Sequence, residues 1–172
     1  KIEIPLNSKL LAIGKNAFED SKIEQINIPS NVSKIGEFAF NRCRNLRKVV
    51  IQKDSKLKVI EDYSFCSSNI EEIFIPSNVS IINKYSFNCC QKLRKVEILP
   101  DSMLTTIGDN AFTRSGIECF YIPRKVSKIC QYAFFYCKKL QIIEISEYSE
   151  IEYIDSTSFS GCPNLIIMKA CY

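Results

Sequence analysis

Phenylalanine recurs along this chain at intervals that alternate between 22 and 25 residues. Each of these phenylalanines follows Ala or Ser, and each has an isoleucine five positions before it. The seven positions are Phe18, Phe40, Phe65, Phe87, Phe112, Phe134 and Phe159. A fixed period of roughly 20–50 residues is the signature of a stacked-repeat architecture. The chain is therefore predicted to fold as a solenoid, which presents an extended surface for its function.

The repeating unit is a pair of coils that together span 47 residues. A shorter coil ends its apolar stretch with Ile-Pro, and a longer coil carries the pattern Cys-x-x-Leu-x-x-Val-x-Ile, with Ile in place of Val in its third copy. The prolines and cysteines that mark the two coils each recur at this interval, as Pro29, Pro76, Pro123, Cys43, Cys90 and Cys137.

Each coil is predicted to contain one strand and one short helical turn. The stretch x-Ile-x-Ile alternates apolar and polar residues, which is the period of a half-buried strand. The stretch Ile-Gly-x-x-Ala-Phe at residues 13–18 has apolar residues spaced for about one helical turn, and its glycine permits a tight entry. Stacked coils would align the strands into one parallel sheet and the phenylalanines into an internal ladder.

The phrase Ile-Pro-Ser-Asn-Val-Ser-Lys-Ile-Gly-Glu-Phe-Ala-Phe-Asn-Arg-Cys at residues 28–43 resembles the BspA-like subclass of leucine-rich repeats. The Leu-x-x-Ile-x-Ile strand is similar to theirs, although it lacks the asparagine that commonly follows. Alternating units rich in Asn, Ile, Lys, Ser, Tyr and Cys resemble the surface families expanded in parasitic protists such as Trichomonas. The resemblance implies an α/β leucine-rich-repeat solenoid of about seven coils. This would be a right-handed superhelix with one parallel sheet on the concave face and short helical turns on the convex face.

A single array is predicted over residues 1–172. No polar cap is visible at either end, and a terminal repeat without a cap exposes the core, so we expect the array to be a fragment of a longer protein. Its 23 basic and 19 acidic residues are interleaved and leave a net charge of +4. This pattern indicates a solvated surface and no nucleic-acid partner. There is no apolar run of 18 residues, so membrane insertion by this segment is not predicted.

The composition argues against catalysis. The chain has no histidine, which removes Ser-His and Cys-His nucleophilic sites and the commonest metal ligand. Only five glycines are present, and no phosphate-binding loop is among them. Two carboxylates from different coils could still form an acid–base pair, but no sequence motif indicates such a pair. We therefore predict no enzyme, no cofactor and no metal site.

The cysteines are interpreted mainly as small buried residues. Cys43 and Cys90 occupy one column but are two coils apart, hence about 10 Å at a spacing of roughly 4.8 Å per coil, beyond the reach of a disulfide. Cys137 and Cys162 lie in adjacent coils, which makes them the one pair of that column that is a disulfide candidate. The redox compartment is therefore left open.

Two Asn-x-Ser sequences, at Asn31 and Asn78, match the glycosylation pattern. They occupy the same repeat position, just after the proline that ends a strand. Because Asn and Ser favour corners of the chain, a purely structural role explains them equally well.

Residues on either side of the inward isoleucines of each strand are expected to face outward. One outward column reads Gln25, Lys48, Glu72, Lys95, Cys119, Ile142 and Ile167, and the other reads Asn27, Val50, Phe74, Glu97, Tyr121, Glu144 and Lys169. Alternating charges favour pairing in the first half. The second half predicts an exposed apolar area, and such areas mark contact surfaces unless neighbouring side chains or further repeats cover them. The predicted binding residues are Phe74, Glu97, Cys119, Tyr121, Ile142, Glu144 and Ile167.

A protein–protein recognition array is the function that these features favour. The resemblance implies a cell-surface or secreted adhesin that binds host or extracellular-matrix proteins. The alternative is a structural spacer with no ligand of its own, and a cytoplasmic location also stays open.

Overall fold

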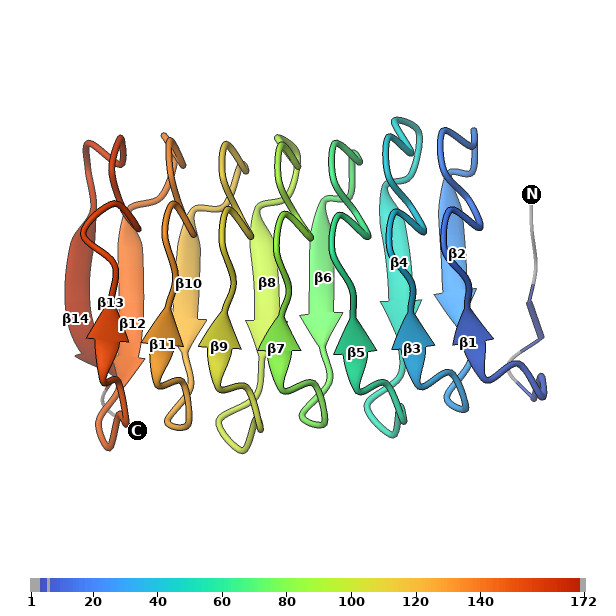
Figure 1. Ribbon diagram of the computed structural model, residues 1–172, viewed down its shortest axis with the longest axis horizontal. Coiled ribbons are helices and arrows are strands. Elements are labelled where there is room, and N and C mark those ends of the chain that lie inside the picture. Colours follow the sequence, from blue (N-terminus) through green and yellow to red (C-terminus); the bar gives the residue numbers. More distant parts are fainter. Residues whose placement is uncertain (1–3, 6, 171–172) are drawn as a thin grey trace.

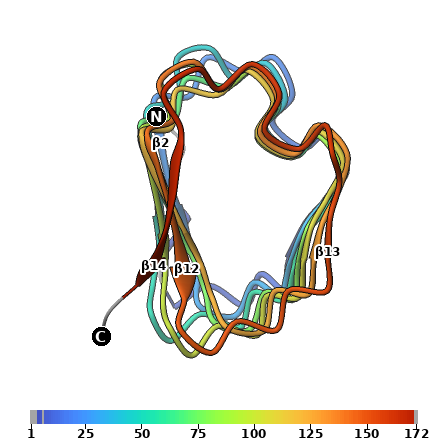
Figure 2. The ribbon, with the colours of Figure 1, turned by 90° about the vertical axis from the view of Figure 1, so that its left-hand side faces the viewer.

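The computed structural model describes residues 4–5 and 7–170, which form seven coils stacked along one axis (Figure 1). The ends of the predicted array, residues 1–3 and 171–172, lie outside the described part of the chain. Viewed along the stack, the coils superimpose around a shared interior, with long strands on one side and short strands on the other (Figure 2). The molecule is therefore a parallel β-solenoid.

The long strands form two parallel sheets that lie next to each other along the stack. The first contains β2 (Gln25–Ile28), β4 (Lys48–Ile51), β6 (Glu72–Ile75) and β8 (Lys95–Ile98). The second contains β10 (Cys119–Ile122), β12 (Ile142–Ser146) and β14 (Ile166–Ala170). In β2, Ile26 and Ile28 are buried while Gln25 and Asn27 are exposed, so the strands predicted from the x-Ile-x-Ile pattern are confirmed.

The opposite side of every coil carries a two-residue strand, and these strands form a sheet of their own. Its members are β1 (Ala12–Ile13), β3 (Lys34–Ile35), β5 (Val59–Ile60), β7 (Ile81–Ile82), β9 (Thr106–Ile107), β11 (Lys128–Ile129) and β13 (Tyr153–Ile154). The prediction of a single sheet was therefore wrong. Two residues are too few to display an alternating pattern, and their isoleucine was assigned to the helical turn.

The segment that carries each phenylalanine is not a helix, and no helix occurs among the described residues. The amide of Phe40 donates to the carbonyl of Ser64 in the next coil, at 2.7 Å. The amides of Ala39 and Asn41 instead close turns on carbonyls three positions back in their own coil. In an α-helix every amide would donate to the residue four positions back. The helical turns predicted from the apolar spacing were therefore wrong.

The amides of this turn donate alternately to the next coil and to their own coil. This arrangement places two residues near each of the first six phenylalanines in the left-handed backbone region. They lie two positions before and two positions after the ring, with φ between 53° and 58°. Bulky residues rarely adopt this conformation, yet Phe38, Tyr63, Tyr85 and Tyr132 all do. The hydrogen bonds to the neighbouring coil compensate for the backbone cost, which is roughly 1–2 kcal/mol per residue.

The seven phenylalanines stack face to face as the predicted internal ladder. Consecutive ring centroids lie 5.0 to 5.4 Å apart, with planes inclined by 3° to 9°. Phe120 of β10 packs its ring edgewise between Phe112 and Phe134, at 5.2 and 5.0 Å. The ladder is thus the part of the core that every coil shares.

Replacing Phe87 by alanine is expected to lower the free energy of unfolding by about 3–5 kcal/mol, because the fully buried ring leaves a cavity between Phe65 and Phe112. Urea denaturation measures this change. The exposed Ile81 lies in the same coil, and Ile81→Ala should cost less than about 1 kcal/mol. Equal losses for the two variants would contradict the role given to the ladder.

Candidate binding surfaces

The N-terminal half of the long-strand face carries charges of alternating sign. Lys48 lies opposite Glu72, and Glu72 lies opposite Lys95, as predicted. Lys95 forms its ion pair along its own strand, with Nζ 3.5 Å from Glu97. Exposed pairs of this kind contribute only about 0–1 kcal/mol. The charges therefore keep this half of the face hydrated and supply little binding energy.

A shallow hollow of about 210 Å³ lies on this face over β4, β6 and β8. Phe74 lines it, opposite Glu97 in the sheet register. The Phe74 side chain is half-buried and packs partly against the core. These two predicted residues are therefore neighbours, but part of the Phe74 ring serves the fold.

The C-terminal half of the face is apolar along one row. Cys119 lies opposite Ile142, which in turn lies opposite Ile166. Cys119 is exposed, Ile142 is half-buried, and Ile166 is 59% exposed.

The second row of this half mixes apolar and acidic residues. Tyr121 lies opposite Glu144, which lies opposite Met168. Tyr121 and Glu144 are half-buried, and Met168 is 42% exposed. Four predicted residues, namely Cys119, Tyr121, Ile142 and Glu144, thus lie together on one sheet.

Ile167 does not occupy its predicted column. The register places it opposite Ile143, which is buried, and not opposite Ile142. The prediction aligned this strand by the distance from Phe159, whereas the Ile166 amide begins the pairing one residue earlier by donating to the carbonyl of Gln141 at 2.7 Å. Ile166 and Met168 therefore complete the apolar area that was expected from Ile167.

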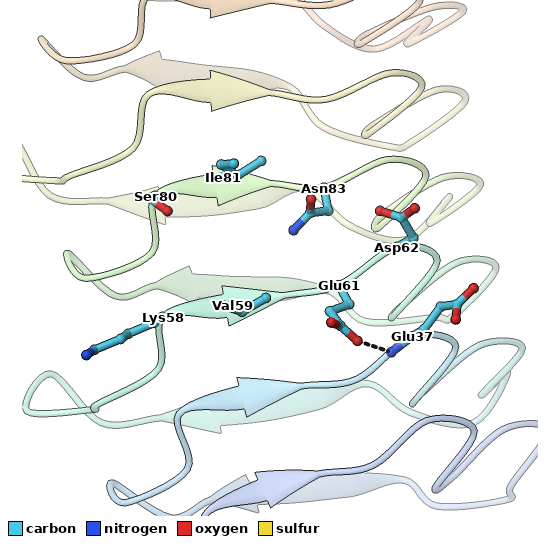
Figure 3. A pocket seen from close by; sticks show the side chains of 8 residues that line it. All are labelled: Glu37, Lys58, Val59, Glu61, Asp62, Ser80, Ile81 and Asn83. Carbon is cyan, nitrogen blue, oxygen red and sulfur yellow. Dashed lines mark hydrogen bonds between the residues drawn. The ribbon is translucent and has the colours of Figure 1, made fainter.

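A second hollow, which the sequence did not predict, lies over the short strands and has a volume of about 500 Å³ (Figure 3). Its floor includes the outward residues of β5 and β7, Val59 and Ile81, both exposed. The lining residues are Glu37, Lys58, Val59, Glu61, Asp62, Ser80, Ile81 and Asn83. The residue before each buried isoleucine could have indicated this hollow, because it faces outward from a short strand. The prediction placed these residues in a helical turn and therefore gave them no outward position on a strand.

The carboxylates of this hollow are largely committed to partners. The Glu37 amide donates to Glu61 Oε2 at 3.1 Å. Lys15 Nζ lies 2.7 Å from Glu37 Oε2, and Lys34 Nζ lies 2.7 Å from Glu61 Oε1. Burial raises the pKa of Asp62, and repulsion by Glu37 and Glu61 adds to this effect. Because lysines neutralise the cluster, it offers little free charge to a ligand.

No metal site or membrane span emerges from the described residues. Across residues 4–5 and 7–170, no group of three His, Cys, Asp or Glu side chains is placed to hold a metal ion. The same part of the chain contains no helix long and apolar enough to cross a membrane.

The cysteine column joins neighbouring coils. The Sγ–H groups of Cys43, Cys90 and Cys137 donate to the carbonyl of the phenylalanine in the preceding coil, at 2.9 to 3.0 Å. In the coil before each of these cysteines, the same column holds a serine, namely Ser21, Ser68 or Ser115, whose hydroxyl lies 3.4 to 3.5 Å from the next thiol. Burial raises the pKa of Cys90 and of Cys137 to about 12. These cysteines are buried thiols, as predicted, and they also act as hydrogen-bond donors.

Cys137 and Cys162, the disulfide candidates, are both free thiols. The Cys162 thiol donates to the carbonyl of Phe134 at 3.1 Å, in the same manner as the rest of the column. The last cysteine of the sequence, Cys171, lies outside the described residues.

The two asparagines of the glycosylation pattern bond to the preceding coil. Asn31 Nδ2 donates to the Ser8 carbonyl at 3.4 Å, and its Oδ1 accepts from Lys56 Nζ at 2.9 Å. Asn78 Nδ2 donates to the Ser55 carbonyl at 3.3 Å. Both amides thus have a structural role at the corner, and their glycosylation stays a prediction.

The repeats of this chain match a known family. The BspA-type leucine-rich repeat region, in six copies, matches residues 1–77 and 58–171. The chain therefore belongs to the BspA-type leucine-rich repeat family. A search of curated proteins by sequence found no match.

Several solved structures share the fold. A leucine-rich repeat protein from Bacteroides ovatus is 25% identical, with a TM-score of 0.75 over 98% of this chain and 43% of that one. The pneumococcal vaccine antigen PcpA is 26% identical, with a TM-score of 0.76 over 85% of this chain and 40% of that one. A leucine-rich cell surface protein from Faecalibacterium prausnitzii is 21% identical, with a TM-score of 0.53, and the match covers 95% of this chain and 52% of that chain.

This chain therefore spans less than half the length of the first two structures. All three come from bacteria, and the resemblance to protist arrays, which rested on composition, stays a prediction.

Cys90→Ser should change the free energy of unfolding by less than about 1 kcal/mol, since serine already occupies this column at Ser68 and a serine hydroxyl at position 90 can donate to the Phe65 carbonyl in place of the thiol. Cys90→Ala should cost about 1 kcal/mol more than Cys90→Ser, because the Phe65 carbonyl loses the side-chain donor and keeps only the Ser68 amide. Urea denaturation of both variants tests the difference. If alanine were tolerated as well as serine, the thiol would be only a space filler.

Thiol alkylation at pH 8 should modify the exposed Cys119 and spare Cys90 and Cys137 in the folded protein. With a pKa of about 12, only about one in ten thousand of these buried thiols is deprotonated at that pH. Peptide mapping by mass spectrometry locates the modified residues, and unfolding in urea should make all of them reactive. Recovery of Cys137 linked to Cys162 would contradict the free-thiol assignment.

Proposed function

We propose that this chain is a protein-recognition scaffold and that its contact surface is the apolar area at the C-terminal end of the long-strand face. The area consists of Cys119, Tyr121, Ile142, Ile166 and Met168. Members of leucine-rich repeat families generally act as protein-interaction scaffolds, and this area is the observation that supports such a role here.

The area has the composition of a contact surface. Apolar side chains lie side by side on a rigid parallel sheet, where a soluble surface would usually carry charge. Tyr121 supplies an aromatic ring of the kind that often anchors an interface, and the neighbouring Glu144 supplies a polar rim. Both rows project from strands held in register, so binding would require little ordering of the surface.

We further propose that the array acts at the cell surface or after secretion, as part of an adhesin that contacts host or extracellular-matrix proteins. BspA-type repeats are often surface-associated. One structural relative is described as a cell surface protein and another as a vaccine antigen. The absence of histidine and of a motif for catalysis argues against an enzyme.

A structural spacer is the alternative function. The charged N-terminal half of the face favours it, because Lys48, Glu72 and Lys95 alternate in sign as they would on a solvated surface. A spacer would retain no protein specifically, which separates the two functions by experiment.

The test uses binding of the array to immobilised extracellular-matrix proteins. The double variant Tyr121→Ser/Ile142→Ser should bind about tenfold or more weakly than the parent, since two apolar contacts are lost. The matched control Val59→Ser/Ile81→Ser alters outward residues of the short-strand sheet and should bind like the parent. An equal loss in both variants, or no binding by the parent, would count against this surface.

A further inference from the structure

A basic hollow lies where three consecutive coils pass from the phenylalanine turn to the long strand. In Figure 1 the backbone of these turns runs along the upper edge of the stack. Its volume is about 520 Å³. Its lining residues, which we name the basic corner, are Gln91, Lys92, Arg114, Ser115, Gly116, Tyr136, Lys138 and Lys139. Four of these carry a positive charge and none carries a negative one.

The positive charges of the basic corner are not neutralised. Lys92, Arg114, Lys138 and Lys139 are exposed, and no described carboxylate lies within salt-bridge distance of any of them. Lys15 and Lys34, beside the short-strand hollow, differ in this respect, since they pair with Glu37 and Glu61. The four cations therefore create a local positive potential that is available to an anionic ligand.

The 47-residue repeat provides an internal comparison. The equivalent corner one unit earlier is built from the same backbone positions, occupied by Arg44, Asn45, Ser67, Ser68, Asn69, Cys89, Gln91 and Lys92. That corner has two cations where the basic corner has four. The extra charges are therefore not required by the fold, because the same coil forms without them.

Gly116 lines the hollow without a side chain of its own. In the earlier unit this position is Asn69, whose Nδ2 donates to the Arg44 carbonyl at 2.5 Å. At Gly116 a Cβ atom would overlap the carbonyl oxygen of Gln91. Glycine at this position therefore lets the backbones of the two coils approach closely, and no side chain from position 116 enters the hollow.

Tyr136 distinguishes among anionic polymers. It is the one aromatic side chain that lines the basic corner. Its ring packs so closely against Gly161 that a Cβ atom added there would lie 2.7 Å from Tyr136 Cδ2. Lys138 Nζ lies over the same ring, 5.8 Å from its centroid. Single-stranded nucleic acids bind by stacking their bases on open aromatic faces. The Tyr136 side chain is 44% exposed, but its ring already contacts Gly161 and Lys138, which favours a ligand held through its anionic groups over one that stacks on the ring.

We propose that the basic corner binds a sulfated polysaccharide whose chain runs along the stack. Coils spaced by about 4.8 Å present cations from three successive turns as a row that a linear polyanion can follow. Arg114 matches a planar pair of sulfate oxygens, and the lysines act as point charges beside it. This site is separate from the apolar area of the long-strand face, so the two proposals can fail independently.

The test measures binding of a fluorescently labelled heparin hexasaccharide by anisotropy. The affinity should fall steeply between about 50 and 200 mM salt, as ion release requires. The variant Arg114→Ser/Lys138→Gln installs the residues of the earlier corner, Ser67 and Gln91, and should bind about tenfold or more weakly. Because the same fold holds those residues one unit earlier, the variant should retain its thermal unfolding midpoint.

The matched control Lys53→Gln/Lys58→Gln removes the same amount of charge from exposed positions elsewhere and should bind within about twofold of the parent. The Tyr121→Ser/Ile142→Ser variant should also retain heparin binding. An equal loss in the control variant would overturn the proposal, as would the absence of binding by the parent. If the parent bound a single-stranded DNA oligomer or phosphatidylserine vesicles more tightly than the heparin hexasaccharide, the proposal would likewise be overturned.

Discussion

Hydrogen bonds between neighbouring coils, donated by the amides of the phenylalanine turns, hold the rest of this molecule in place. The Phe40 amide donates to Ser64 and the Phe65 amide to Ser86, and this pattern repeats along the stack. It requires left-handed residues on both sides of each ring, which fixes the shape of the turn. Once the coils are spaced in this way, the rings stack at 5.0 to 5.4 Å and the buried isoleucines align in three parallel sheets, two of long strands and one of short strands.

A uniform interior leaves only the outward positions free to vary between repeats. Every coil supplies an isoleucine and a phenylalanine, and cysteine or serine occupies the position three residues after the ring, as at Cys90 and Ser68. No such requirement acts on Tyr121 in the long-strand face or on Arg114 in the basic corner. The 47-residue unit makes these departures visible, because an equivalent position in the same fold shows which residue stacking alone would accept. Both proposed surfaces contain such departures, namely Ile142 where the earlier unit has Lys95, and Arg114 where it has Ser67.

The sequence predicted the strands, the ladder and the cysteine column because each follows from a period that burial imposes on every coil. The predicted helical turn was wrong, because the spacing from Ile13 to Phe18 suits two structures equally well. One is a helical turn, and the other is a turn whose amides donate alternately to the next coil and to their own coil. The same error concealed the short-strand sheet and the hollow beside Val59. Ile167 was misplaced because its register depends on where the Ile166 amide pairs, which the spacing alone does not specify.

The amino-acid sequence by itself determined the solenoid, its seven coils and the residues that form its core, because the 22- and 25-residue spacing recurs in every copy. Tertiary structure alone decided which charges are paired. Lys34 meets Glu61 in the next coil, whereas Arg114 and Lys138 meet no carboxylate among the described residues. The same positions are buried in every coil, so the pattern of apolar residues in the sequence reveals them. Ion pairs and hollows form between residues about 25 positions apart, and they depend on side-chain directions that only the stacked coils define.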